Sequence, residues 1–199
     1  MLSPYMLNTL ATGMAVLAGG WGLLVKRRVF WVTLGLAISL VADYFMSYQG
    51  RGTHYFLLGV GWFTLAHGCF ILQCWTAKSW NWHRFLPVLA GYLIFYFGWL
   101  FGHLPDTAIK IAALGYLLFS VVSLEAACGQ FFTGKNWSSL MFLLGILLLV
   151  FSDTMIALRT FMNISACGPW ILPTYRLCHL FLGISIVLSK NRENKRQNI

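Results

Sequence analysis

The chain has 199 residues, of which 59% are hydrophobic and 10% charged, and its mean hydropathy is +0.72. This apolar share is well above that of a soluble domain, so the composition excludes a water-soluble enzyme and predicts an integral membrane protein. The formal net charge of +9 does not indicate nucleic-acid binding, because the basic residues are spread over the ends of apolar segments instead of forming one patch.

Apolar segments of about 20 residues, long enough to cross a bilayer, recur along the chain. They cover residues 6–25, 29–46, 56–74, 85–102, 110–128, 138–158 and 171–188. No basic region precedes the first segment, so we expect it to be a retained span and not a signal peptide. The pattern predicts an all-α polytopic bundle of about seven transmembrane helices. Residues 1–189 would form this single domain, followed by a basic cytosolic tail at 190–199.

The basic residues predict how the bundle is inserted, because cytoplasmic loops carry an excess of Lys and Arg. Ten of the 14 lie at one set of span ends and four at the other. The ten are Lys26, Arg27, Arg28, Lys78, Arg84, Lys135, Lys190, Arg192, Lys195 and Arg196, and the four are Arg51, Lys110, Arg159 and Arg176. We therefore expect the N-terminus outside and the C-terminus in the cytoplasm, in a bacterial inner membrane or a eukaryotic endomembrane.

Two acidic residues, Asp43 and Asp153, lie near the ends of long apolar runs. A charged side chain within a membrane costs at least about 2.5–3.5 kcal/mol and is usually functional. Both are expected at a similar depth near the outer side. In the structural alternative, Asp43 pairs with Arg51, and Asp153 pairs with Arg159 or with an arginine of the last span. The acid of the fifth span, Glu125, falls near the cytoplasmic end and is expected to be structural.

Other polar residues are predicted at the same depth as the two aspartates. Tyr175 and His179 are four residues apart and share one face of the last span, with Arg176 one step round the helix. His67 lies near the middle of the third span. Each also has a structural interpretation, since His67 can be a neutral interior histidine and Tyr175 an interfacial anchor.

Two carboxylates in a low-dielectric pocket suggest acid/base chemistry, because one can be protonated while the other stays ionised. Such a pair suits acid-catalysed cleavage through an oxocarbenium-like state. The sequence contains neither a G-x-S-x-G nor an H-E-x-x-H motif.

Three segments, taken in order, resemble the YhhN-like lysoplasmalogenase family. Asp43, followed by the segment 56–67 with its Gly, Phe and His, is similar to the family's second and third spans. The segment 151–161 resembles its Ser-Asp motif, and the segment 175–179 its final helix. The family usually shows about eight spans and a Lys-Pro near the second. Here no Lys-Pro occurs, and Ala42 stands where Gly is usual.

The resemblance implies a membrane enzyme that hydrolyses the vinyl ether bond of a lysophospholipid, lysoplasmalogen, and releases a fatty aldehyde and a glycerophospho-alcohol. No cofactor is expected. Under this hypothesis Asp43 and Asp153 are the acid/base pair, with their individual roles left open. Ser152 belongs to the Ser-Asp motif.

The remaining predicted site residues would support this pair. His67 and His179 would orient water or a carboxylate, and Tyr175 would donate a hydrogen bond. Arg176 or Arg159 would hold the lipid phosphate, which suits a guanidinium group.

Two alternatives use the same residues. Asp43, His67, Asp153 and His179 would bind a metal such as zinc in a metal-dependent lipid ester or amide hydrolase. Intramembrane Asp and His would equally suit a small proton-coupled transporter, although no internal repeat is evident. The sequence leaves the oligomeric state open.

Overall fold

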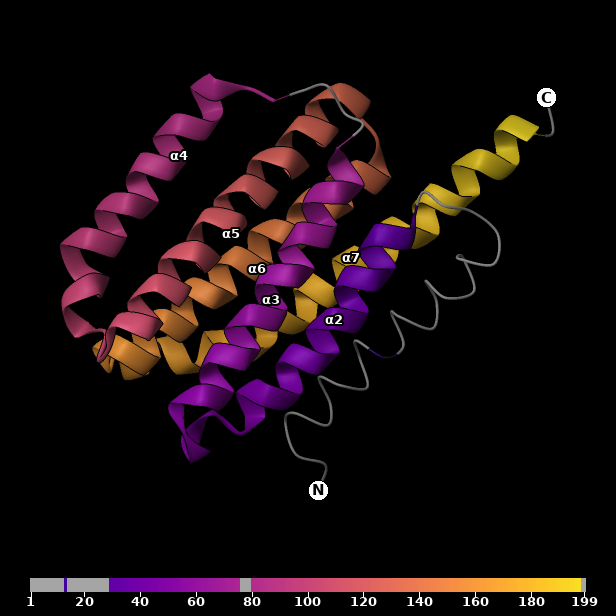
Figure 1. Cartoon of the computed structure of the whole chain (residues 1–199). Coiled ribbons are helices and arrows are strands. Elements are labelled where there is room, and N and C mark those ends of the chain that lie inside the picture. Colours follow the sequence, from indigo (N-terminus) through magenta and orange to yellow (C-terminus); the bar gives the residue numbers. More distant parts are fainter. Residues whose placement is uncertain (1–12, 14–28, 76–79, 198–199) are drawn as a thin grey trace.

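The structure, a computed structural model, describes residue 13 and residues 29–75 and 80–197, with side chains as far as residue 189. This part of the chain is helical and contains no strand, which confirms the all-α prediction. The long helices are α2 (Phe30–Ser47), α3 (Thr53–Cys74), α4 (Trp82–Phe95), α5 (Thr107–Gly134), α6 (Trp137–Met162) and α7 (Gly168–Gln197) (Figure 1). Helix α4 continues as a π-helical stretch, η3 (Tyr96–Leu100), and a 3₁₀ turn, η4 (Phe101–His103). Two further 3₁₀ turns are η2 (Gln49–Arg51) and η5 (Ser165–Cys167).

Six stretches of the described residues are long and apolar enough to cross a membrane. They are Phe30–Ser47, Thr53–Cys74, Trp82–His103, Thr107–Gly134, Trp137–Met162 and Ser165–Ser189. Each overlaps one of the predicted spans from the second to the seventh, and the first predicted span, 6–25, lies outside the described residues. The protein is therefore a multi-pass membrane protein.

Local backbone signals, more than hydropathy, decide where the helices begin and end. Helices α5 and α6 run beyond their predicted ends at 128 and 158, as far as Gly134 and Met162. The residues that follow, Lys135 and Asn163, have left-handed backbones with φ of 41° and 56°, a conformation that stops a helix. At the other end of α6, Asn136 accepts a hydrogen bond from the Ser139 N–H in a capping box.

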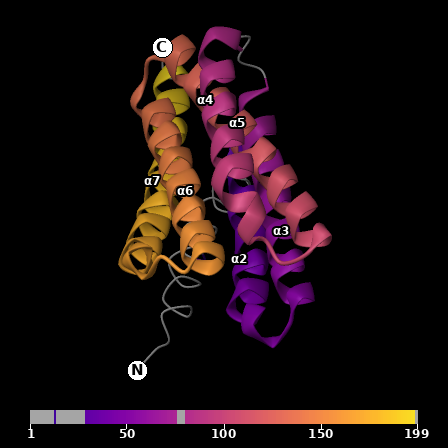
Figure 2. The same cartoon turned by 90° about the vertical axis from the view of Figure 1, so that its left-hand side faces the viewer.

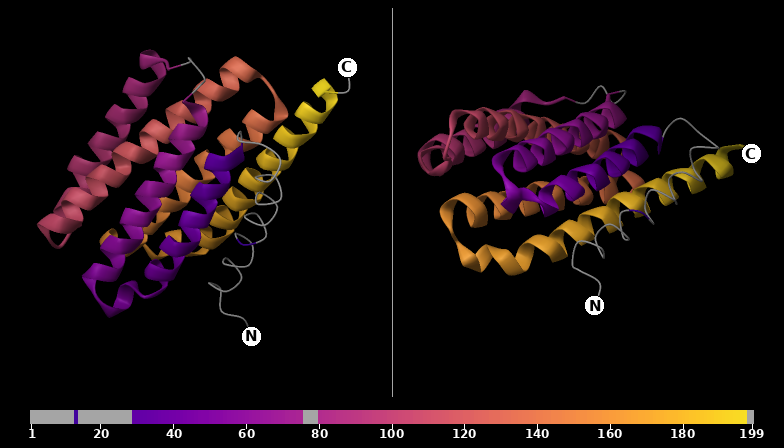
Figure 3. Two further views of the ribbon diagram at one scale, coloured as in Figure 1. Left: turned by 45° about the vertical axis from the view of Figure 1, so that its right-hand side comes forward. Right: turned by 60° about the horizontal axis from the view of Figure 1, so that its bottom comes forward.

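The helices form two layers. Helices α4, α5, α3 and α2 lie side by side in that order, and α6 and α7 pack against each other behind them (Figures 1 and 2). The right-hand view of Figure 3 shows the two layers edge on. Helix α5 contacts α6, and α2 contacts α7, so side chains from all the inner helices meet between the layers.

The outer surface of the bundle is apolar and its ends carry tryptophan. Trp75, Trp80, Trp82, Trp137 and Trp170 lie at helix ends and are between 42% and 76% exposed, as expected for rings at a membrane interface. Three of the four basic residues assigned to the outer side lie at junctions between helices. Arg51 lies between α2 and α3, Lys110 in the first turn of α5 after α4, and Arg159 in the last turn of α6 before α7. These junctions lie at the same, lower end of Figure 1. Which end faces the cytoplasm stays a prediction.

Candidate functional site

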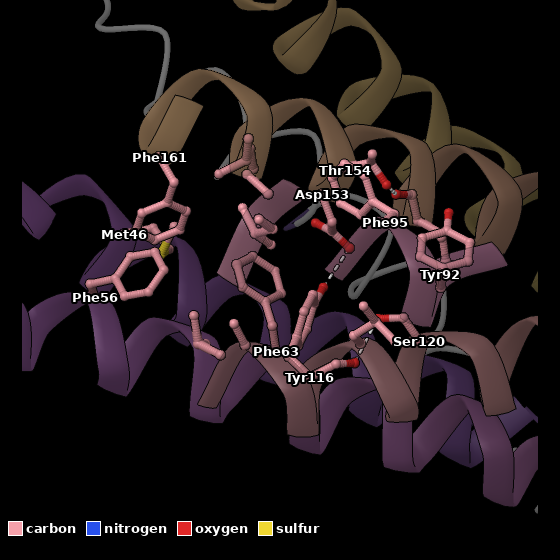
Figure 4. A pocket seen from close by; sticks show the side chains of 17 residues that line it. Met46, Phe56, Phe63, Tyr92, Phe95, Tyr116, Ser120, Asp153, Thr154 and Phe161 are labelled. Atoms are coloured by element: carbon pink, nitrogen blue, oxygen red, sulfur yellow. Dashed lines mark hydrogen bonds between the residues drawn. The ribbon is translucent and has the colours of Figure 1, made fainter. Parts of the chain in front are cut away.

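Three polar side chains from three different helices meet between the layers. Asp153 of α6 points toward α5, where the Tyr116 hydroxyl donates a hydrogen bond to its Oδ2 atom (Figure 4). The Nε2 atom of His67, on α3, lies 3.2 Å from the Tyr116 hydroxyl and 3.8 Å from Asp153 Oδ2. Asp153, Tyr116 and His67 therefore form one continuous polar group inside the membrane-spanning bundle.

A serine of α5, Ser123, contacts the second ring nitrogen of His67. The Nδ1 atom of His67 lies 2.7 Å from Ser123 Oγ. The Ser123 hydroxyl donates to the Ser120 carbonyl at 2.9 Å, and the Ser120 hydroxyl donates to the Tyr116 carbonyl at 2.9 Å. When the Ser123 hydroxyl donates to this carbonyl, its oxygen accepts from His67 in the tautomer that carries the hydrogen on Nδ1. His67 is fully buried, with 0% of its surface exposed.

A second polar group joins α2 to α7. The Tyr175 hydroxyl donates to Asp43 Oδ1 at 2.8 Å, and both side chains are buried. The Asp43 Oδ2 atom is also buried, and no described residue offers it a hydrogen bond. His179 Nδ1 donates to the Tyr175 carbonyl at 2.9 Å, and the two rings lie 4.3 Å apart. The depth argument placed these three residues in one slab of the membrane, and here they are in contact.

Asp153 faces a cavity between the two layers, whereas Asp43 does not. The cavity holds about 780 Å³ of empty space, part of it open to the outside. Its lining residues are Met46, Phe56, Val60, Phe63, Tyr92, Phe95, Leu100, Ala113, Tyr116, Leu117, Ser120, Val150, Asp153, Thr154, Ile156, Ala157 and Phe161. Phe63 meets the ring of Tyr175 edge-on at 6.1 Å. Its ring thus lies between the cavity and the group formed by Tyr175 and Asp43.

The lining is apolar except near Asp153. Aromatic rings of Phe56 and Phe161 meet edge-to-face at 5.4 Å on one side of the cavity, where Met46 also lies (Figure 4). On the other side Tyr92 and Phe95 of α4 approach Thr154. Asp153 is the one carboxylate among the described lining residues. An acid placed against such a surface can meet the apolar part of a ligand.

The other predicted site residues lie outside this cavity. Ser152 is buried and donates to the Ile171 carbonyl at 3.1 Å, so it joins α6 to α7 and points away from the cavity. Arg159 is exposed in the last turn of α6, beside Gly168. Arg176 is half-buried on α7. The suggested pairing of Asp43 with Arg51 is not formed, because Arg51 lies over the Tyr48 ring at 4.5 Å.

Glu125 lies in a separate, charge-neutral site. Its Oε1 atom accepts from Arg84 Nη2 at 2.8 Å and from the Asn81 backbone N–H at 3.0 Å. These contacts tie α5 to the first turn of α4, as expected for a structural acid.

Tyr116, Ser120 and Ser123 were not among the predicted site residues. They follow one another at spacings of four and three residues, which places them on one face of α5. A polar stripe of this kind in an apolar span was the available signal. The described residues contain no group of three His, Cys, Asp or Glu side chains placed to hold a metal ion. The zinc alternative thus has no ligand set in that part of the chain.

The whole chain was compared with known proteins. No curated protein and no solved structure matches it. The family model of the YhhN family matches residues 4–186, which is nearly the entire chain and includes both polar groups and the cavity. This protein is therefore a member of the YhhN family, the family of lysoplasmalogenases.

Proposed function

We propose that the protein hydrolyses the vinyl ether bond of lysoplasmalogens, releasing a fatty aldehyde and a glycerophospho-alcohol. One observation carries the proposal. In a chain of the YhhN family, Asp153 is the one carboxylate among the described residues that line an apolar cavity between membrane-spanning helices. An acid next to an apolar ligand is what protonation of a vinyl ether requires.

The cavity suits a single-chain lipid. Its walls are aliphatic and aromatic, with Asp153, Thr154 and Ser120 as nearby polar groups. The alkenyl chain would lie against these walls with its first two carbons beside Asp153.

Asp153 serves first as acid and then as base in this mechanism. The carboxyl group gives its proton to the second alkenyl carbon, a C–H bond forms, and positive charge develops on the first carbon and the ether oxygen. A water molecule adds to the first carbon and passes a proton to the Asp153 carboxylate, which restores the acid. The resulting hemiacetal breaks into the aldehyde and the alcohol, so no proton is gained or lost overall.

Asp43 would assist from behind the cavity wall. Its carboxylate, held by the Tyr175 hydroxyl at 2.8 Å, would stabilise the developing cation through the Phe63 layer by its negative charge. Within the pair, the proposal makes Asp153 the proton donor. Arg159, in the last turn of α6 close to the lining residue Phe161, would meet the phosphate at the end predicted to face outside.

The test is release of aldehyde from a 1-alkenyl lysophospholipid by the purified protein and by Asp153→Asn. General acid/base catalysis contributes about 10²–10⁴-fold to rate, so the variant should lose about that much in kcat. Ser152→Ala is the matched control, because Ser152 is the neighbouring residue and points to α7. It should stay within about twofold of the native protein.

Two results would count against the proposal. Equal aldehyde release by Asp153→Asn and the native protein would remove the acid from the mechanism. No aldehyde from well-folded native protein would indicate an ester or amide lipid hydrolase, or transport. Assays of ester lysophospholipids and of proton-driven flux in liposomes then separate those functions.

A further inference from the structure

We propose that a one-way hydrogen-bond chain, running from Asp153 through Tyr116, His67 and Ser123 to the backbone carbonyl of Ser120 on α5, holds Asp153 as a protonated acid. The first hydrogen bond of this chain, between Asp153 and Tyr116, reverses its direction when Asp153 gives up its proton. The catalytic use of that proton rests on the proposed function, whereas the hydrogen-bond chain does not. The hydrogen-bond chain makes Tyr116 and His67 positioning residues for Asp153.

The direction of the chain follows from counting hydrogens, beginning at the backbone. Each serine hydroxyl has one hydrogen, and the hydroxyls of Ser120 and Ser123 both give it to a carbonyl of α5, at 2.9 Å in each case. Ser123 Oγ therefore accepts from His67 Nδ1 at 2.7 Å. A neutral imidazole that carries its hydrogen on Nδ1 has a lone pair on Nε2. His67 thus presents an acceptor to Tyr116.

The Tyr116 hydroxyl lies between two acceptors and has one hydrogen. It is 3.2 Å from His67 Nε2 and hydrogen-bonded to Asp153 Oδ2. When Asp153 is protonated, its carboxyl O–H donates to the Tyr116 oxygen and the tyrosine donates to His67. When Asp153 is ionised, the tyrosine turns its hydrogen to the carboxylate, across the contact that a dashed line marks in Figure 4.

With the hydrogen of His67 on Nδ1, the first arrangement leaves the group uncharged and gives the Nε2 lone pair a donor. In the second, His67 Nε2 loses its donor, because the nearby Ser120 hydroxyl, at 3.4 Å, is committed to the Tyr116 carbonyl. A buried polar atom without a partner costs about 1–3 kcal/mol, and His67 is fully buried. The chain therefore holds the proton on Asp153 until a substrate takes it.

The reversal also serves the step that follows. Once the proton has moved to the substrate carbon, the Tyr116 hydroxyl donates a hydrogen bond to the new carboxylate. The hydroxyl is already in place, so no water has to rearrange around the charge. After the attacking water returns a proton to Asp153, the hydroxyl turns back to His67. In these steps no proton passes through His67.

Infrared spectroscopy of the purified protein tests the chain without any substrate. A protonated carboxyl group has a carbonyl stretch well separated from that of a carboxylate, and the difference between native protein and Asp153→Asn isolates the band of Asp153. We expect the band of a protonated carboxyl group in the native protein, and a shift of that band to higher frequency in Tyr116→Phe, where one hydroxyl is lost. A carboxylate band in the native protein, or no change in Tyr116→Phe, would overturn the proposal.

A matched pair of variants at His67 tests the neutral role of the imidazole. His67→Gln keeps one donor and one acceptor, and His67→Leu has a similar size with neither. We expect kcat within about fivefold of native for His67→Gln and lower by about 10–100-fold for His67→Leu and Tyr116→Phe, with KM little changed in all three. Equal losses in the two His67 variants would contradict a hydrogen-bonding role.

The two readouts separate this inference from the proposed function. If the infrared band and its shift are present but no vinyl ether is cleaved, the proposed function fails and the chain stands. If cleavage depends on Asp153 but the band is absent, the chain fails. Tyr116→Phe changes a single hydroxyl and keeps the ring, so this result does not depend on whether His67→Leu folds.

Discussion

Glu125 of α5 and Asp153 of α6 are both acids on membrane-spanning helices, but their surroundings differ in kind. Glu125 accepts from the Arg84 guanidinium at 2.8 Å and from a backbone N–H at 3.0 Å. Asp153 contacts the Tyr116 hydroxyl and the His67 imidazole, and it faces a cavity. An acid neutralised by a cation fixes the position of a helix, whereas an acid that faces a cavity away from water can hold a proton that it gives to a ligand.

Asp43 stands between these two cases. It is buried and held by a tyrosine hydroxyl, like Asp153, but it does not line the cavity, and its Oδ2 atom has no hydrogen-bond partner among the described residues. The comparison therefore ranks three acids by their access to a substrate. Substitutions at each acid and in the cavity test that order.

The largest effect after that of Asp153→Asn is expected from Asp43→Asn. The amide has the same shape and can still accept from Tyr175, but it removes the negative charge behind the cation. We expect kcat to fall by about 10–100-fold, with KM unchanged within about twofold. Tyr175→Phe is the companion variant, because it removes the hydroxyl and keeps the carboxylate, and it should cost less. A loss as large as that of Asp153→Asn would place both acids at the reacting atoms.

The cavity itself is tested by Ala113→Leu. Ala113 lines the cavity on α5, so a larger side chain should displace part of the lipid chain. We expect KM to rise by about tenfold for a long alkenyl chain and less for a short one, because each excluded methylene forfeits about 0.8 kcal/mol of burial. Ala108→Leu is the control, since Ala108 is exposed on the first turn of the same helix. An equal rise for both variants would mean that the substrate binds elsewhere.

The smallest effect on catalysis is expected from Glu125→Gln, which breaks the ion pair with Arg84. Hydrogen bonds to charged groups contribute about 1.5–3 kcal/mol, and Arg84 is partly exposed at 29%, so we expect the lower part of that range. Thermal unfolding in detergent should show a lower midpoint, while kcat per folded molecule stays within about twofold of native. A large loss of kcat with unchanged stability would reverse the assignment of Glu125 and Asp153.

Much of the fold was predictable because membrane solvation acts locally along the chain. Every lipid-facing backbone group must be hydrogen-bonded within its own helix, so each long apolar run predicts one span. The structure confirms six of these in its described part. The predicted ends of α5 and α6 were wrong by several residues, because Lys135 and Asn163 stop those helices through their backbone conformation and not through polarity.

By itself, the sequence determined the class of protein, the order of the spans, and which acids lie inside the membrane. It also predicted the depth at which Asp43 and Tyr175 meet, because depth depends only on position along a helix. The partners of Asp153 needed the tertiary structure. Tyr116 and His67 are separated by 49 positions, and their contact depends on the rotation and packing of α3 and α5. Apolar helices leave that rotation undetermined until their side chains interlock, so only the packed bundle separates the acid that faces the cavity from the acid behind Phe63.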